Sequence, residues 1–111
     1  MSNPKLEARE KVYAGLVGFG LGVPVSMYPA GNAGGSRVSL VGSTLYPTGK
    51  VDIVVKVQVP EPSGLAPLEQ LEWDTLTAIR AMGGVGWSET RTQVREEAGQ
   101  IIFTEFTITT K

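Results

Sequence analysis

The strongest constraint on the fold is a run of alternating residues at positions 51–59. Branched apolar residues occupy every second position and mostly polar residues lie between them: Val51, Ile53, Val55, Val57 and Val59 against Asp52, Val54, Lys56 and Gln58. Because successive side chains of a strand point to opposite faces, this pattern predicts a strand with one buried face. Pro60 ends it, since proline cannot donate a hydrogen bond to a sheet ladder.

A hairpin is expected around this strand. Residues 37–42 form a second short strand, and the turn sequence Tyr-Pro-Thr-Gly-Lys at 46–50 joins the two. The two strands should pair in antiparallel fashion, with Ile53 and the odd-numbered valines facing a core. Residues 23–28 can form a further short strand.

Two helices are predicted. Asn3 and Pro4 form a helix start, because Asn caps free N–H groups and Pro is tolerated at the first helical position. The first helix covers residues 4–18, with its apolar side formed by Leu6, Tyr13, Leu16 and Val17. The second covers residues 65–82, and its apolar stripe has a width suited to packing on a sheet. That stripe consists of Leu65, Leu68, Leu71, Leu76, Ile79 and Met82.

The last quarter reads as a second hairpin, with strands at 87–95 and 101–110 and a turn at 96–100. Phe103 and Phe106 fall on opposite faces in strict alternation, so either a bulge lies near Thr104 or both faces of the sheet are covered. The whole chain, residues 1–111, is expected to be one domain of the α+β class. Its antiparallel sheet of two hairpins should carry two helices packed on one face.

The amino-acid composition argues against catalysis and against metal binding. The chain has neither histidine nor cysteine, which excludes Ser-His-Asp and Cys-His nucleophiles, disulfides and ordinary zinc sites. No carboxylate spacing matches a metal loop or an acid–base pair, so we expect no enzyme, no metal and no cofactor. The net charge of −1 is unlike the basic surplus of a free-standing nucleic-acid binder. The N-terminus lacks the apolar core of a signal peptide, and glycines and prolines interrupt residues 12–30, so we expect a soluble chain made inside the cell.

The strand at 87–95 is polar on both faces. Strict alternation places Trp87 on one face together with the interface candidates Glu89, Arg91, Gln93 and Arg95. A strand of this kind is either a solvated hairpin arm or an edge that pairs with a neighbouring subunit. We expect the four candidates to lie at a contact with a neighbouring subunit.

Two further features are candidate contacts. Glu72 lies inside the apolar stripe of the second helix, where it is either a carboxylate extending from the stripe's edge or a paired charge at a subunit or tertiary contact. The loop at 30–36 is expected to be flexible because of Gly31, Asn32, Gly34 and Gly35. It leads into a strand and lacks the Gly-Lys-Ser/Thr helix start of a phosphate-binding loop, so it is a connector or an assembly contact.

The order of these segments resembles the tail terminator proteins of long, non-contractile bacteriophage tails. The resemblance runs through the first helix, the turn at 28–31, the strand at 52–60, the helix with Leu-Glu-Gln-Leu at 68–71, and the polar strand that returns over 102–109. It implies a virion protein that forms a homo-oligomeric ring, typically of six copies, on the completed tail tube, with the interface candidates of the strand at 87–95 and Glu72 at a subunit or tube contact. Such a ring ends tube polymerisation and provides the head-docking surface.

The same resemblance implies the partners. They are further copies of the chain, the major tail tube protein and a head–tail connector protein, with DNA passing through the ring without sequence-specific binding and no membrane. The expected location is the head-proximal end of the virion tail, and the host cytoplasm during assembly. The alternatives are another neck or tail-tube subunit, or a small host-directed binding protein.

Overall fold

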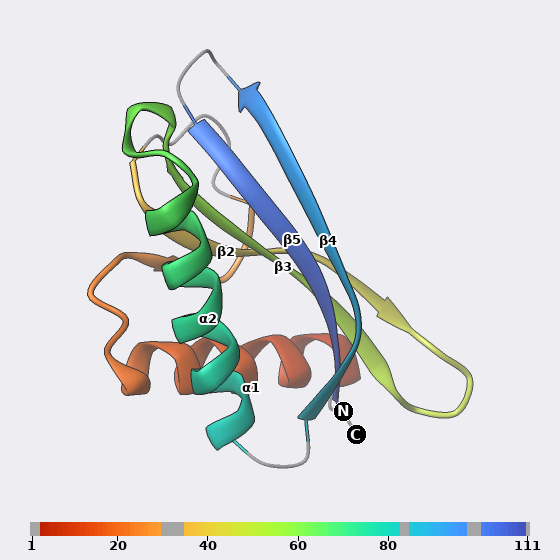
Figure 1. The fold of residues 1–111 in the computed structure, drawn as a ribbon. Coiled ribbons are helices and arrows are strands. Elements are labelled where there is room, and N and C mark those ends of the chain that lie inside the picture. Colours follow the sequence, from red (N-terminus) through yellow and green to blue (C-terminus); the bar gives the residue numbers. More distant parts are fainter. Residues whose placement is uncertain (1–2, 30–34, 83–84, 98–100, 111) are drawn as a thin grey trace.

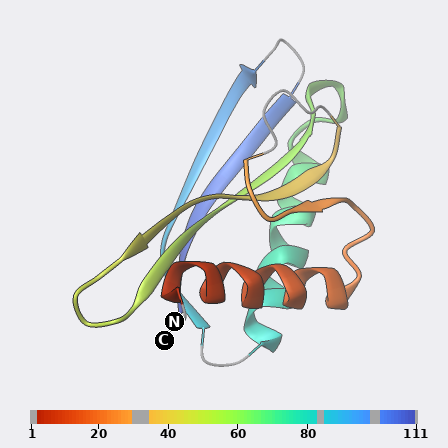
Figure 2. The same cartoon turned by 180° about the vertical axis from the view of Figure 1, so that it is seen from behind.

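The computed structural model describes the backbone of most of the chain. The described backbone covers residues 3–29, 35–82, 85–97 and 101–110, and the described side chains cover residues 3–29, 35–82 and 101–109. The elements follow in the order α1 (Pro4–Phe19), β1 (Val25–Ser26), β2 (Arg37–Leu45), β3 (Val51–Pro60), the short helix η1 (Glu61–Ser63), α2 (Leu65–Ala81), β4 (Val85–Glu97) and β5 (Ile101–Thr110). Figures 1 and 2 show the two helices and the sheet from opposite sides.

The α+β class is confirmed, with five strands in the order β1-β2-β3-β5-β4. Both predicted hairpins are present, as the antiparallel pairs β2–β3 and β4–β5, and β3 pairs with β5 between them. The expectation of a purely antiparallel sheet is wrong in one respect, because β1 runs parallel to β2. Residues 27–36 separate β1 from β2 along the chain.

Strand β3 is central, and its predicted inward face is confirmed, while Gln58 on the opposite face is also buried. The five inward side chains at odd positions 51–59 are between 0% and 2% exposed. Buried residues of both helices join them in one core, to which β2 contributes Val38 and Leu40 and β5 contributes Ile102, Phe106 and Ile108. Both helices therefore pack on the same face of the sheet.

Helix α1 begins as predicted, but the face it buries differs. The side-chain oxygen of Asn3 accepts hydrogen bonds from the backbone N–H groups of Lys5 and Leu6, and Pro4 is the first helical residue. Of the four predicted apolar positions, Leu16 is buried and Tyr13 packs against the core, whereas Leu6 and Val17 are exposed. The buried residues are Ala8, Arg9, Val12 and Leu16. The helix is rotated by roughly a quarter turn from the expectation, because small Ala8 and a buried arginine complete the stripe.

Helix α2 buries most of its predicted stripe. Leu68, Leu71 and Ile79 are buried together with Thr75 and Ala78, and Leu76 and Met82 pack at the edge of the core. Leu65, at the first turn, is 50% exposed. The stripe is therefore confirmed from Leu68 onward.

Phe103 and Phe106 of β5 are both buried, on opposite faces of the sheet. The alternative in which both faces are covered is therefore confirmed over the alternative of a bulge. The register of β3 with β5 is unbroken from Val51–Thr110 to Pro60–Ile101, so no bulge lies near Thr104 in that pairing. Phe106 is 1% exposed on the helix side, and Phe103 is 4% exposed on the other side. The ammonium group of Lys56 lies 4.5 Å from the centroid of the Phe103 ring and covers part of it.

We expect Ile53→Asp to prevent folding. Ile53 has no exposed surface, and an unpaired carboxylate there costs several kcal/mol, comparable with a typical total stability of about 5–15 kcal/mol. Val54→Asp, one residue along on the opposite face, is the matched control and should remain folded. Circular dichroism and urea denaturation measure both, and an Ile53→Asp variant as stable as the control would contradict the register.

Candidate assembly surfaces

The two edges of the sheet are unequal. Strand β1 has two residues and pairs only with Val38 and Ser39 of β2, whereas β4 at the other edge runs over 13 residues. Among the described strands, β4 pairs with β5 alone. An edge strand of this length carries a row of backbone N–H and C=O groups to which a further strand can add. β4 is therefore the candidate contact for strand addition.

Arg9 forms hydrogen bonds with β2 at the opposite edge of the sheet. Its side chain leaves α1 and Nη1 donates to the carbonyl oxygens of Met27 and Leu40, at 2.6 Å each, while Nη2 donates to Oγ of Ser43 at 3.2 Å. The register of β2 with β3 shifts between Leu40 and Gly42, so the guanidinium binds β2 at a bulge. Bulges and inward-pointing charges are two ways in which sheets prevent unwanted strand addition.

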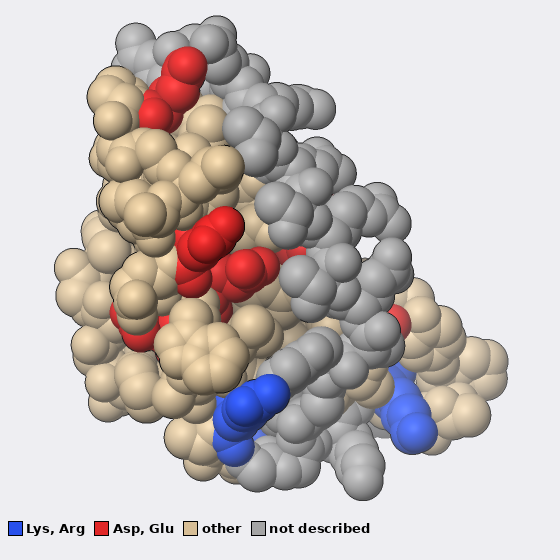
Figure 3. Space-filling view, viewed as in Figure 1, with Lys and Arg blue, Asp and Glu red and all other residues tan. Residues whose placement is uncertain are grey.

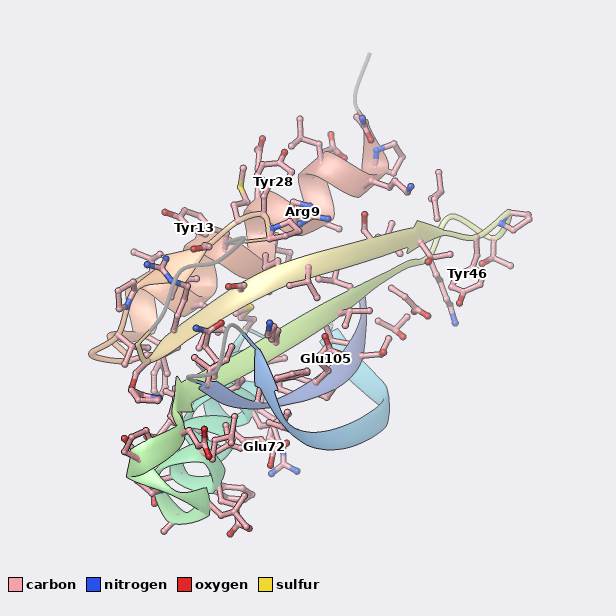
Figure 4. The ribbon with its side chains drawn as sticks, turned by 90° about the horizontal axis from the view of Figure 1, so that it is seen from above. Arg9, Tyr13, Tyr28, Tyr46, Glu72 and Glu105 are labelled. Carbon is pink, nitrogen blue, oxygen red and sulfur yellow. The ribbon has the colours of Figure 1, made fainter. Side chains whose placement is uncertain are left out.

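Tyr28 completes this site. Its ring centroid lies 4.7 Å from the guanidinium carbon of Arg9, and Figure 4 shows the two side chains together beside α1. Arg9 is only 8% exposed, although its charge made it look like a surface residue of the helix. The sequence indicates the burial of Arg9 only through its spacing, because Arg9 lies one position after Ala8 and three before Val12, which are both buried.

Three of the predicted interface residues share one face of the sheet by register. Glu89 is opposite Thr107, Arg91 is opposite Glu105 and Gln93 is opposite Phe103. Their partners continue across β3 to Val54, Lys56 and Gln58, which lie on the face away from the helices. Arg91, Glu105 and Lys56 thus occupy one cross-strand row of the register.

Trp87 does not belong to that row, which corrects the strict alternation. The register of β4 shifts between Trp87 and Glu89, and Trp87 is opposite Ile108, a fully buried core residue. The extra residue, Ser88, changes the face on which the strand continues. A second shift lies between Gln93 and Glu97, and Arg95 falls within it without a register partner. The side chains of β4 lie outside the described residues.

Glu72 has a partner within the chain. Thr104, 1% exposed on the inner face of β5, donates its hydroxyl to Oε2 of Glu72 at 3.1 Å. This hydrogen bond joins α2 to the sheet, so Glu72 makes a tertiary contact.

Of the residues expected to make the loop at 30–36 flexible, Gly31, Asn32 and Gly34 lie outside the described residues. Gly35, at φ +81°, accepts a hydrogen bond at its carbonyl from Nε2 of the buried Gln58, at 3.1 Å.

The β2–β3 hairpin forms an arm that extends away from the helices (Figures 1 and 2). Residues 44–50, which form the end of this arm, are all exposed, and Leu45 and Tyr46 are each 43% exposed. Asp52 holds the tyrosine, because its Oδ2 accepts from the Tyr46 hydroxyl at 2.8 Å while its Oδ1 accepts from Thr109 at 2.7 Å. The arm therefore presents its aromatic ring in a fixed position.

One hollow of the described surface is lined by α1 and the segment that follows it. An open groove of about 430 Å³ lies between α1, at Tyr13, Leu16 and Val17, and the segment 20–25. Within the described residues, no three Asp or Glu side chains are grouped closely enough to hold a metal ion. No helix among them has the length and apolar character needed to cross a membrane. The described surface thus offers edges and protruding side chains as its main features.

We expect Arg9→Ala to lower the free energy of unfolding by about 3 kcal/mol, because the buried carbonyl oxygen of Leu40 and the partly buried one of Met27 lose a charged donor. Lys11→Ala, an exposed position on the same helix, should change it by less than about 0.5 kcal/mol. Urea denaturation followed by circular dichroism measures both. Equal midpoints for the two variants would show that the Arg9 hydrogen bonds do not stabilise the fold.

The hydrogen bond to Asp52, and then the charge of that carboxylate, raise the pKa of Tyr46 above its usual value of 10.0. We expect Asp52→Asn to lower this pKa toward the usual value, which an ultraviolet titration of phenolate formation measures. Tyr46→Phe identifies the signal among the three tyrosines. Because folding raises the pKa of Tyr46, the hydrogen bond to Asp52 contributes its full stability below about pH 10, the usual pKa of tyrosine. This contribution is lost as the pH rises through the higher pKa of Tyr46 in the folded protein. Identical titrations of the wild type and Asp52→Asn would contradict this contact.

No family model and no curated protein matches this sequence. The functional assignment therefore depends on the geometry of the chain itself. Three features carry it: the long edge strand β4, the opposite edge protected by Arg9, and the arm that displays Tyr46.

Proposed function

We propose that this chain is a structural subunit of a phage tail, which forms a homo-oligomeric ring on the tail tube, ends tube polymerisation and provides the surface for head docking. The observation that carries the proposal is the inequality of the two sheet edges. One is closed by β1, a bulge and Arg9, and the other is the 13-residue strand β4. In this proposal β4 contacts a neighbouring subunit or the tube protein.

The charge pattern of β4 supports a specific contact rather than aggregation. The Arg and Glu residues along this edge strand oppose indiscriminate pairing, while they favour a partner with complementary charges. Arg91 and Arg95 lie on this strand within five positions of each other. Arginine is enriched at interfaces because its planar donor group binds carboxylates and carbonyl groups in defined geometry.

The near-neutral net charge is also compatible with a ring. The chain has 10 Lys and Arg against 11 Asp and Glu. A charge of −1 repeated in every copy adds little repulsion between neighbours, whereas a strongly charged subunit would oppose closure. The lumen of such a ring passes DNA without reading its sequence.

Replacing both Arg91 and Arg95 with Ala should weaken assembly by about tenfold or more while the fold is kept. Arg91 is opposite Glu105 in the register, and a cross-strand pair of opposite charges contributes less than about 1 kcal/mol, so the fold should tolerate the exchange. Native mass spectrometry and sedimentation measure the oligomer, and circular dichroism measures the fold. The matched control is Lys5→Ala with Lys11→Ala, which removes two exposed cations from α1.

The wild-type protein distinguishes the candidate functions. Closed rings that bind the ends of purified tail tubes in electron micrographs support the terminator proposal. Long filaments would instead identify a tail-tube subunit. A strict monomer that never associates with tubes would overturn the assembly role altogether.

A further inference from the structure

We propose that the end of the β2–β3 arm and the end of β5 are coupled through the carboxylate of Asp52, which acts as a latch. Tyr46, in the turn of the arm, donates to one oxygen of this carboxylate, and Thr109 of β5 donates to the other. The arm then has a held state, in which Tyr46 is bonded to Asp52, and a released state, in which this hydrogen bond is broken. The inference concerns a single copy of the chain, so it does not depend on the proposed ring.

The end of the arm lies outside the core. Residues 44–50 are all exposed, and the first buried residue after the turn is Val51, which is 2% exposed. Two backbone hydrogen bonds of 2.9 Å close the turn, from the N–H of Tyr46 to the carbonyl oxygen of Lys50 and from the N–H of Gly49 to that of Tyr46. Segments that are held by exposed backbone hydrogen bonds open locally at a small cost in free energy. A side-chain contact at this place therefore changes how often the turn opens.

The hydrogen bond to Asp52 is that side-chain contact. Within the part of the chain that the structure describes, it is the one side-chain hydrogen bond made by residues 44–50. Figure 4 shows Tyr46 at the end of the arm. Residues 44–49 carry no charge that could form an ion pair in its place, and Figure 3 shows the end of the arm, at the right of the view, as mostly uncharged surface.

Asp52 is held on its other side by β5. The register places it opposite Thr109, on the sheet face away from the helices. The Thr109 hydroxyl donates to Oδ1 of Asp52 at 2.7 Å, while the Tyr46 hydroxyl donates to Oδ2 at 2.8 Å. Hydrogen bonds to a charged acceptor are stronger than those between neutral groups, and a carboxylate bonded at both oxygens keeps its orientation. Thr109 is therefore a positioning residue of the latch.

The same row of the sheet reaches the edge strand β4. Thr44 is opposite Asp52, and Thr109 is opposite Gly86, so the row crosses β2, β3, β5 and β4 in turn. The latch thus joins the arm to the strand that pairs with β4, and not only to its own hairpin. In the held state the direction of the Tyr46 ring is set by the sheet, whereas in the released state the ring is free to turn away from it.

Amide hydrogen exchange at Gly49, measured by NMR, reports the opening of the turn, because this N–H is bonded to the carbonyl oxygen of Tyr46. Tyr46→Phe removes only the hydroxyl donor, and Asp52→Ala removes the acceptor. Each should raise the exchange rate about fivefold, as expected for the net loss of one hydrogen bond. Thr48→Ala removes an exposed hydroxyl from the same turn and is the matched control, with a change of less than about 1.5-fold.

Thr109 tests the coupling between the two ends. Thr109→Val keeps the shape of the side chain and removes its hydroxyl, so exchange at Gly49 should rise about threefold although the substitution lies in another strand. Thr109→Ser restores the donor and should return the rate to that of the wild type. In a Tyr46→Phe background, Thr109→Val should have no further effect, because no tyrosine hydrogen bond is left for Asp52 to make.

A local release differs from a general loss of stability in its other readouts. The urea midpoint and the exchange of amides in the middle of β3, such as that of Val57, should change little in Tyr46→Phe. If Gly49 exchanges at the same rate in Tyr46→Phe as in Thr48→Ala, the backbone alone closes the turn and there is no latch. If Thr109→Val leaves the rate unchanged, or raises it equally with and without the Tyr46 hydroxyl, the two ends are not coupled through Asp52. Both results are independent of the ring, which is tested by the oligomeric state of the wild type.

Discussion

The fold depends on the complete coverage of one face of β3. Its five inward side chains are almost without exposed surface, and no single helix covers them, since α1 packs toward β1 and β2 while α2 packs toward β5. The two helices therefore have to meet over the central strand. This requirement places α2 with its remaining face outward, where Trp73 and Leu65 are exposed.

Arg9 shows how a core of this kind accommodates a charge. The guanidinium is nearly buried, but its two nitrogens bind two carbonyl oxygens and a hydroxyl, and its face lies against Tyr28. Each of these groups would otherwise need water. The same contacts fix the position of α1 on the sheet, which explains why the buried stripe of that helix runs through Ala8 and Arg9 rather than through Leu6 and Val17.

Sequence patterns predicted most of the fold because they reflect local physics. The period of two in β3, the Asn-Pro helix start and the stripe of α2 each depend on residues close together in the chain, and each is confirmed. What could not be predicted depends on partners distant in sequence. The register shift at Ser88 that moves Trp87 to the row of Ile108, the parallel pairing of β1 and the burial of Arg9 all require knowing which strand or carbonyl lies opposite. Strict alternation has no signal for a bulge, and the charge of an arginine suggests a solvated surface.

The inequality of the sheet edges has a consequence for stoichiometry. A sheet with two open edges can pair with a further strand on each side, so that an assembly of such sheets can grow without limit. In the described part of the sheet, β1 and Arg9 cover part of the β2 edge, and strand pairing through the longer edge β4 would join each copy to one partner strand. A ring built from such copies presents as many equivalent β4 edges as it has members. A cylinder with the same rotational symmetry as the ring can pair with every β4 edge at once. A cylinder of different symmetry leaves some β4 edges without a partner strand.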